Sequence, residues 1–155
     1  MEKQEPREVK AQIFVPYEVA LGPTWINFYE ALKDERILGT KCDKCGRVFV
    51  PPRSFCPKCF QELEVWVEVG QQGVVETWVY VNMPFYGQQL DLPFVAAMIR
   101  LDGSDTALMH RIAGFDLSDI AVVRRKLKLG DRVSAVWRKE KKGCVLDIDY
   151  FQPIL

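Results

Sequence analysis

The spacing of hydrophobic residues changes once along the chain, near residue 64. Before this point, the stretch that begins at Gly22-Pro23 has helical spacing, and Pro is favoured at the first position of a helix. The apolar face of this helix consists of Trp25, Phe28, Tyr29 and Leu32. Such a face packs either on its own chain or on a partner protein, and the sequence leaves both alternatives open.

From residue 64 onward, apolar and polar residues alternate, which is typical of β-strands. The segments are EVWVEV, GVVETWVYVN, FVAAMIRLD, TALMHRIAG, RVSAVWRKE and CVLDIDYF. Turn residues separate them, including Asp102-Gly103 and Gly143. Between the fourth and fifth segments, Ser118 as N-cap and Gly130 as the stop predict a short helix. This order suits a closed barrel of five to six strands, and the OB-fold matches it best.

Four cysteines lie in two Cys-x-x-Cys pairs within CDKCGRVFVPPRSFCPKCF, residues 42–60. Each pair presents two thiolates from one tight turn, and two such turns make a tetrahedral metal site. The predicted ligands are Cys42, Cys45, Cys56 and Cys59. Zinc is the expected ion and iron is the alternative. Because four protein thiolates leave no position for water or substrate, the site is predicted to be structural.

Together these patterns predict a mainly β protein in three parts. An N-terminal arm and amphipathic helix occupy residues 1–36, a zinc ribbon residues 37–62, and an OB-fold domain residues 63–155. The arm contains the apolar stretch IFVPYEVAL, so we expect it to lie on a surface.

Composition narrows the function classes. The chain has 155 residues with 21 basic and 21 acidic side chains, so its formal charge is zero. This balance argues against a protein that mainly binds a polyanion. The charged start, MEKQEPREVK, does not resemble a signal peptide, and no apolar run has the length of a membrane span. We therefore expect a cytoplasmic protein with reduced cysteines.

The charge is unevenly distributed, with two basic segments. Residues 36–60 carry six basic and one acidic side chain, and residues 124–142 carry nine and two. The basic residues around the cysteines either offset the negative charge of a zinc–thiolate centre or contact an anion such as phosphate. They are Lys41, Lys44, Arg47, Arg53 and Lys58. The second segment either lies near phosphates or faces an acidic partner.

Catalytic chemistry has few candidates in this sequence. His110 is the only histidine, and its alternation with Leu108 and Ile112 favours a structural position on a strand. Cys144 stands apart from the other cysteines and is interpreted as a small core residue. No nucleophile, phosphate-binding or dinucleotide motif is present. We therefore predict no catalytic set in this chain.

A long connection lies between the second and third strand segments. The stretch NMPFYGQQLDLPF, residues 82–94, is longer than a hairpin needs and contains Phe85 and Tyr86. It is interpreted either as a functional loop that contacts a partner or acyl-CoA, or as a cap on the barrel.

In this order, the motifs resemble acyl-CoA-associated OB-fold proteins with a rubredoxin-like zinc ribbon. The resemblance covers residues 25–153 and rests on WINFYEAL, ILGTKCDKCGRVFVPPRSFCPKC, WVEVGQQGVVETWVYV, LPFVAAMIRLD, LKLGDRVSAVW and the final FQP. Phe60 departs from the family, whose second cysteine pair usually continues with Gly.

The resemblance implies an accessory subunit of a thiolase that makes or cleaves β-ketoacyl-CoA thioesters. The N-terminal arm and the Arg/Lys balance make the chain similar to small subunits of benzoylsuccinyl-CoA thiolases of anaerobic toluene breakdown. The expected cofactor is structural Zn²⁺, and the CoA thioester is a ligand of the complex. Contacts to the partner or to acyl-CoA are expected from Trp25, Phe28, Tyr29, Phe85, Tyr86, Arg53 and Lys58.

Two other functions are compatible with zinc ribbons and OB barrels. One is a single-stranded nucleic-acid-binding module, which the acidic strand region between residues 64 and 112 disfavours. The other is a free-standing acyl-CoA carrier or hydrolase, which would bind or cleave thioesters without a partner.

Overall fold

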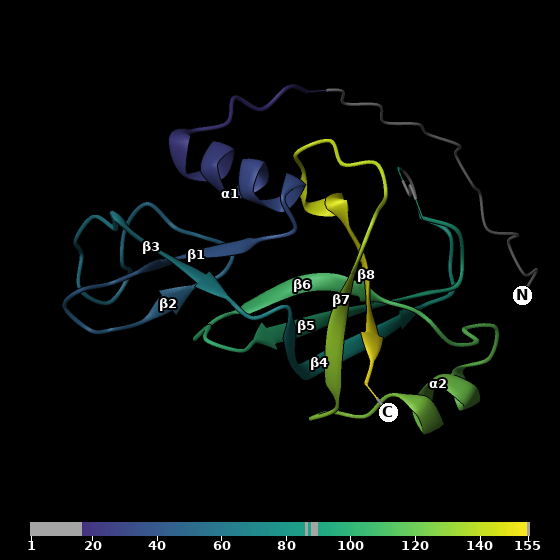
Figure 1. Cartoon of the computed structure of the whole chain (residues 1–155). Helices are drawn as coiled ribbons and strands as arrows, with labels where there is room; N and C mark the ends of the chain where they lie inside the picture. Colours follow the sequence, from purple (N-terminus) through teal and green to yellow (C-terminus); the bar gives the residue numbers. More distant parts are fainter. Residues whose placement is uncertain (1–16, 86, 88–89, 155) are drawn as a thin grey trace, which may run out of the picture.

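The computed structural model describes residues 17–85, 87 and 90–154. The elements in chain order are α1 (Pro23–Lys33), β1 (Ile37–Lys41), β2 (Val48–Phe49), β3 (Val65–Val69), β4 (Gln72–Val81), β5 (Phe94–Leu101), β6 (Ala107–Ile112), α2 (Ile120–Lys126), β7 (Arg132–Trp137), the 3-10 helix η1 (Val145–Asp147) and β8 (Ile148–Pro153). Figure 1 shows a small sheet at the left, with α1 above it, joined to a barrel at the right with α2 at its lower edge. The predicted mainly β class is confirmed.

The barrel is closed, with the strand order β4-β5-β6-β8-β7. β6 and β8 are its parallel pair, and α2 connects β6 to β7, as in an OB-fold. The inward side chains alternate with outward ones, so Val75, Ile99, Val133 and Phe151 are fully buried. The predicted barrel is therefore confirmed, with five strands.

The small sheet has the order β2-β1-β3. β3 pairs with β1 from Ile37↔Val69 to Lys41↔Val65, so this strand belongs to the ribbon sheet by its hydrogen bonds. The domain boundary expected from the sequence, at residue 63, places β3 in the OB-fold domain. Gly39 in β1 permits a close approach, because a Cβ there would lie 2.9 Å from the Phe49 carbonyl oxygen.

Helix α1 begins at Pro23 after the N-cap Gly22, as predicted. Phe28 and Leu32 are fully buried, so this part of the apolar face packs on its own chain. Trp25 is 39% exposed. Packing on its own chain therefore holds for Phe28 and Leu32. In the first turn of the helix, Trp25 presents an exposed aromatic side chain that a partner protein can contact.

The second helix and the last strand differ in detail from the prediction. The N-cap of α2 is Asp119, whose carboxylate accepts a hydrogen bond from the Ala121 N–H, and the prediction of Ser118 was wrong by one residue. The segment after Cys144 begins with η1 before it becomes β8. No helix in the described part of the chain is long and apolar enough to cross a membrane.

Candidate metal centre and contact surface

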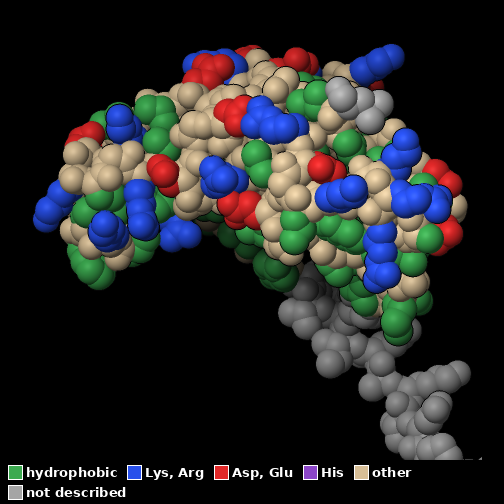
Figure 2. Space-filling view, turned by 90° about the horizontal axis from the view of Figure 1, so that it is seen from below, with side chains coloured by type: hydrophobic (Ala, Val, Ile, Leu, Met, Phe, Trp, Pro, Cys, Tyr) green, Lys and Arg blue, Asp and Glu red, His purple; other side chains and the backbone are tan. Residues whose placement is uncertain are grey.

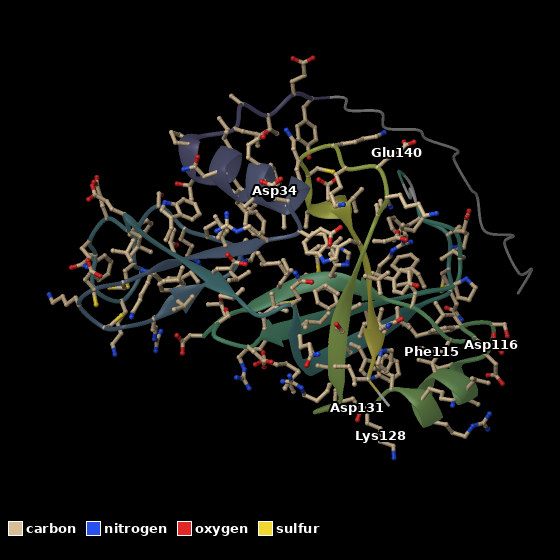
Figure 3. The ribbon with its side chains drawn as sticks, viewed as in Figure 1. Asp34, Phe115, Asp116, Lys128, Asp131 and Glu140 are labelled. Atoms are coloured by element: carbon tan, nitrogen blue, oxygen red, sulfur yellow. The ribbon has the colours of Figure 1, made fainter. Side chains whose placement is uncertain are left out.

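The four predicted ligands come together at the end of the ribbon away from the barrel. Cys42 and Cys45 lie in the turn between β1 and β2, and Cys56 and Cys59 in the following hairpin. Their Sγ atoms all lie within 4.8 Å of one another, and Figure 3 shows these sulfur atoms at the left. The four cysteines are thus positioned to bind one metal ion.

The spacing of the sulfur atoms fits a zinc tetrahedron. Zn–S bonds of about 2.3 Å place two tetrahedral sulfurs about 3.8 Å apart. The Sγ atoms of Cys45 and Cys56 are 3.8 Å apart. Gln61 donates a hydrogen bond from Nε2 to the Cys42 Sγ at 3.5 Å, as expected of a group that orients a ligand from outside the first coordination sphere.

The two cysteine turns have the same backbone geometry. The Gly46 N–H donates to the Cys42 carbonyl at 2.7 Å, and the Phe60 N–H donates to the Cys56 carbonyl at 2.8 Å. Gly46 has φ 74° and Phe60 has φ 55°. Phe60 therefore adopts the left-handed conformation that Gly adopts in the first turn, so the departure at this position leaves the second turn intact.

The crowded thiols of the cluster shift the pKa values of two cysteines in opposite directions. Burial acts to raise the pKa of Cys56, but hydrogen bonds from the backbone N–H groups of Cys59 and Lys58 outweigh it and lower the pKa to about 7. Burial and hydrogen bonds with the neighbouring thiols, led by Cys45, raise the pKa of Cys59 to about 12. Because the thiols are crowded, the cluster cannot readily hold four negative charges without a cation.

Basic side chains surround the cluster. Lys41, Lys44, Arg47, Arg53 and Lys58 are all exposed. None of them forms an ion pair with another residue in the described part of the chain. Figure 2 shows Lys and Arg side chains at the ribbon end on the left and also at the α2 end on the right.

The structure brings together two contact residues predicted from separate segments. Trp25 of α1 and Arg53 of the ribbon line one hollow of about 510 Å³, together with Phe55. The Arg53 guanidinium also lies over the Phe49 ring, 5.5 Å from its centroid. Phe55 was missed from the sequence because a single aromatic residue in a turn-rich segment has no periodic pattern.

The other predicted contact residues lie elsewhere. Phe28 is fully buried and Tyr29 is half-buried, with the Tyr29 ring 5.5 Å from that of Trp25. Phe85 is exposed in the loop between β4 and β5, which Figure 1 shows on the side of the barrel away from the ribbon. Tyr86 lies outside the described residues. The predicted contacts therefore form two separate groups.

His110 and Cys144 have the following environments. His110 is buried on β6, its Nε2 is 3.3 Å from the Val145 carbonyl oxygen, and burial lowers its pKa. A buried neutral imidazole of this kind fits the structural interpretation. Cys144 is half-buried at the N-cap of η1, where its thiol donates to the Asp147 carboxylate at 3.7 Å. It therefore has a polar contact that its interpretation as a core residue did not include.

Asp34, Asp116 and Asp131, which Figure 3 labels, lie away from the cysteines. Asp34 is the C-cap of α1, and Asp131 accepts a hydrogen bond from the Lys128 N–H at 2.7 Å in the turn before β7. Asp116 accepts one from the Ser118 N–H at 2.9 Å before α2. The carboxylates of Asp116 and Asp131 thus stabilise turns.

Comparison with known proteins matches both parts of the fold. Residues 30–64 match the ChsH2 rubredoxin-like zinc ribbon domain, and residues 66–138 match the ChsH2 C-terminal OB-fold domain. The chain thus contains two domains of the ChsH2 type, a rubredoxin-like zinc ribbon followed by an OB-fold domain. The two matches meet at residues 64–66.

Two curated proteins are similar over most of their length. A DUF35 domain-containing scaffold protein of Methanocaldococcus jannaschii is 27% identical over 107 residues, which is 68% of this chain and 70% of that protein. A protein of the same description from Methanothermobacter thermautotrophicus is 26% identical, over 68% of this chain and 74% of that protein.

Two solved structures share the fold. The Ltp2-ChsH2(DUF35) aldolase contains a chain that is 23% identical, with a TM-score of 0.65 and coverage of 88% of this chain and 98% of that one. A DUF35-family protein of Sulfolobus solfataricus is 26% identical, with a TM-score of 0.59 and coverage of 86% and 83%.

Proposed function

We propose that this chain is a non-catalytic subunit of a thiolase-type complex that acts on a β-ketoacyl-CoA thioester. In this proposal the ribbon and barrel dock on the catalytic chain and help to shape its CoA and acyl site. Two kinds of comparison support a partner. Similar proteins are described as scaffolds, and one structural neighbour is an Ltp2-ChsH2(DUF35) aldolase, in which a ChsH2 chain is paired with Ltp2.

The observation that carries the proposal is an apolar surface along the arm and the start of α1. Tyr17 is 81% exposed, and Val19, Leu21, Trp25 and Ile26 are also exposed. Contiguous exposed apolar side chains of this kind usually mark interfaces. The hollow between Trp25 and Phe55 extends this surface onto the ribbon.

The metal in this proposal is a structural zinc ion. Cys42, Cys45, Cys56 and Cys59 would hold it, and the ion would supply folding energy to a ribbon whose sheet is very small. With all four positions taken by thiolates, the centre leaves no site for a substrate. Its role is to fix the turns that carry the exposed basic and aromatic side chains.

The ligand of the complex is proposed to be a CoA thioester. Exposed Arg53 and Lys58 on the ribbon are assigned to contacts with the catalytic chain or with CoA phosphates, since cations bind either. The acyl group proposed from the sequence resemblance is benzoylsuccinyl, whose CoA thioester belongs to anaerobic toluene degradation. Phe85 and Tyr86 of the segment 82–94 are assigned to a second contact with the partner or with the acyl-CoA.

Co-purification tests the proposed function. The tagged chain and a thiolase-type catalytic chain are co-expressed, and the purified material is analysed by light scattering after size exclusion. We expect one species that contains both chains in a fixed ratio. Separate elution of the two chains, with binding of this chain to single-stranded oligothymidylate, would favour the nucleic-acid alternative instead.

A further inference from the structure

A cavity of about 500 Å³ lies against β5 and β6, the second and third strands of the barrel. The connection between β4 and β5 and the segment between β7 and β8 complete its walls. In Figure 1 the first of these connections lies at the right of the barrel and the second rises above it. OB-folds bind ligands on this face, between these two connections. The position therefore indicates a ligand site, and the side chains must show which ligand it suits.

Most of the walls are apolar. Met109 of β6 is 68% exposed and Leu146 of η1 is 40% exposed, although both are large apolar side chains. The other apolar residues of the lining are Leu90, Phe94, Ala96 and Val145. A cavity of this volume with mainly apolar walls and a few polar groups is typical of a site for a small organic molecule.

Two arginines supply the polar groups of the cavity. Arg111 of β6 and Arg138, which follows β7, line it, and both contact the carboxylate of Asp149 in β8. Two guanidinium groups that share one carboxylate leave a surplus of one positive charge.

Arg138 has donors to spare for a ligand. Its Nε donates to the Asp149 carboxylate at 3.2 Å, and its side chain is 40% exposed. Its two terminal nitrogens donate to no other residue in the described part of the chain. A guanidinium group with both terminal nitrogens available binds a carboxylate by two parallel hydrogen bonds.

The acidic side chains of the region do not remove the surplus charge. Asp91 and Glu140 lie in the two connections but do not line the cavity, and the exposed Lys139 and Lys142 offset their charges. Asp147 is almost fully buried, and its carboxylate accepts hydrogen bonds from backbone N–H groups of residues 142–144. No acidic side chain of the described residues lines the cavity.

This lining does not suit a polynucleotide. Single strands bind to exposed aromatic rings along a positive groove, whereas Phe94 supplies the aromatic ring here and is half-buried. His110 also lines the cavity, but burial lowers its pKa, so it adds no positive charge at neutral pH. One surplus charge beside apolar walls complements a ligand with a single anionic group and an apolar body.

We propose that this cavity binds an apolar carboxylate. The aryl or alkyl body of the ligand packs against Met109 and Leu146, and its carboxylate accepts hydrogen bonds from the terminal nitrogens of Arg138. The inference goes beyond the proposed function, because it gives this chain a ligand that it binds without a partner.

A matched pair of small molecules tests the proposal on the full chain as purified. 4-Phenylbutyrate and its uncharged amide, 4-phenylbutyramide, are titrated separately, and NMR of methyl-¹³C methionine follows the resonance of Met109. We expect a saturable shift with 4-phenylbutyrate and a dissociation constant of about 1 mM or below. The amide should bind about tenfold or more weakly, because a charge-assisted hydrogen bond is lost.

The decisive variant is Arg138→Met, which keeps the apolar stem and removes the guanidinium. It should bind 4-phenylbutyrate about tenfold or more weakly and bind the amide like the wild type. Arg138→Lys should retain part of the affinity, because it keeps the charge without the planar fork. The matched control is Arg100→Met on β5, which also loses an arginine paired with one carboxylate, that of Glu76, but lies outside the cavity lining. This control should bind like the wild type.

Met109→Glu is a second, independent variant. The side chain at this position is mostly exposed, so the fold should accept glutamate, and the melting temperature checks this. The new carboxylate lies in the cavity and repels the ligand, so binding of 4-phenylbutyrate should be lost.

Four outcomes would overturn the inference. They are no binding of 4-phenylbutyrate by the wild type, equal affinities for the acid and the amide, full affinity of Arg138→Met, and full affinity of Met109→Glu. None of them bears on co-purification with a catalytic chain, so the proposed function would stand. Binding of oligothymidylate that is lost in Met109→Glu, without binding of 4-phenylbutyrate, would assign this face to single-stranded nucleic acid instead.

Discussion

Asp147 binds the backbone of Gly143 through a hydrogen bond of 2.8 Å from the Gly143 N–H to its carboxylate. The same side chain, which is almost fully buried, accepts hydrogen bonds from the N–H groups of Lys142 and Cys144. Gly143 in turn lies against α1, where a Cβ would be 2.5 Å from the Lys33 Cε. One carboxylate thus holds the β7–β8 connection beside the helix that borders the ribbon.

Replacing Asp147 by Ala should therefore destabilise the fold. The change removes the acceptor of three partly buried N–H groups, and a hydrogen bond to a charged group contributes about 1.5–3 kcal/mol. Urea unfolding followed by circular dichroism measures the difference. Asp149→Ala is not a suitable control, because Arg111 and Arg138 both contact Asp149. Asp34→Ala, at the exposed end of α1, should change stability far less.

The same contacts predict a pH dependence. Burial acts to raise the pKa of Asp147, but the hydrogen bonds from the backbone N–H groups of Lys142, Gly143 and Cys144 outweigh it and lower the pKa. A carboxyl group whose pKa is lowered on folding contributes stability above its unfolded pKa of about 3.9, and this stability is lost as the pH falls through the folded value. The stability difference between the wild type and Asp147→Asn should be constant from about pH 7 to pH 5 and shrink below about pH 4. A difference that grows on acidification would show the opposite sign of the pKa shift.

Loss of one cysteine ligand should release the metal and unfold the ribbon. Cys56→Ser removes one thiolate of the cluster, and binding energy in such sites is also folding energy. Elemental analysis of freshly purified protein should show zinc in the wild type and background levels in the variant. Cys144→Ser is the matched control and should retain the metal, because Cys144 does not belong to the cluster. Metal-free wild-type protein would refute the assignment.

Phe28 and Trp25 should separate folding from partner binding. Phe28→Ala empties a fully buried position and should cost about 3–5 kcal/mol of unfolding free energy. Trp25→Ala removes a ring that is partly exposed and should cost much less stability while weakening binding to the catalytic chain. Chemical denaturation and calorimetry provide the two readouts. Equal stability losses with no change in binding would mean that both residues serve the core alone.

The loop between β4 and β5 gives a separate prediction. The double variant F85A/Y86A should retain the metal, since the connection between β4 and β5 lies on the side of the barrel away from the ribbon (Figure 1). The variant should bind the partner or acyl-CoA more weakly. Metal content and binding are measured on the same preparation. Unchanged binding would favour the interpretation of this loop as a cap on the barrel.

The features that the sequence predicted best are those encoded locally. The cysteine spacing determines which side chains meet, and the alternating pattern after residue 64 identifies strands without need of tertiary information. The same pattern could not separate β3 from the barrel strands, because ribbon and barrel strands have the same period of two. The partner of β3 is fixed by its hydrogen bonds to β1, which a local pattern does not contain.

The parts that were missed depend on distances between segments. Helical spacing places Trp25 and Phe28 on one face, but it does not predict how deeply each side chain is buried. In the fold, Phe28 is buried and Trp25 is partly exposed. The hollow between Trp25, Arg53 and Phe55 joins two segments that only the fold brings together. Ser118 and Asp119 are both good N-caps, so composition could not choose between adjacent residues.

The most direct test of the central claim is an assay of thiolysis. This chain and a thiolase-type catalytic chain are expressed apart and together, and each preparation is assayed with benzoylsuccinyl-CoA and free CoA. The account predicts turnover by the complex and none by this chain alone, because the partner supplies the nucleophilic and acid–base groups. Robust turnover by this chain alone would contradict it.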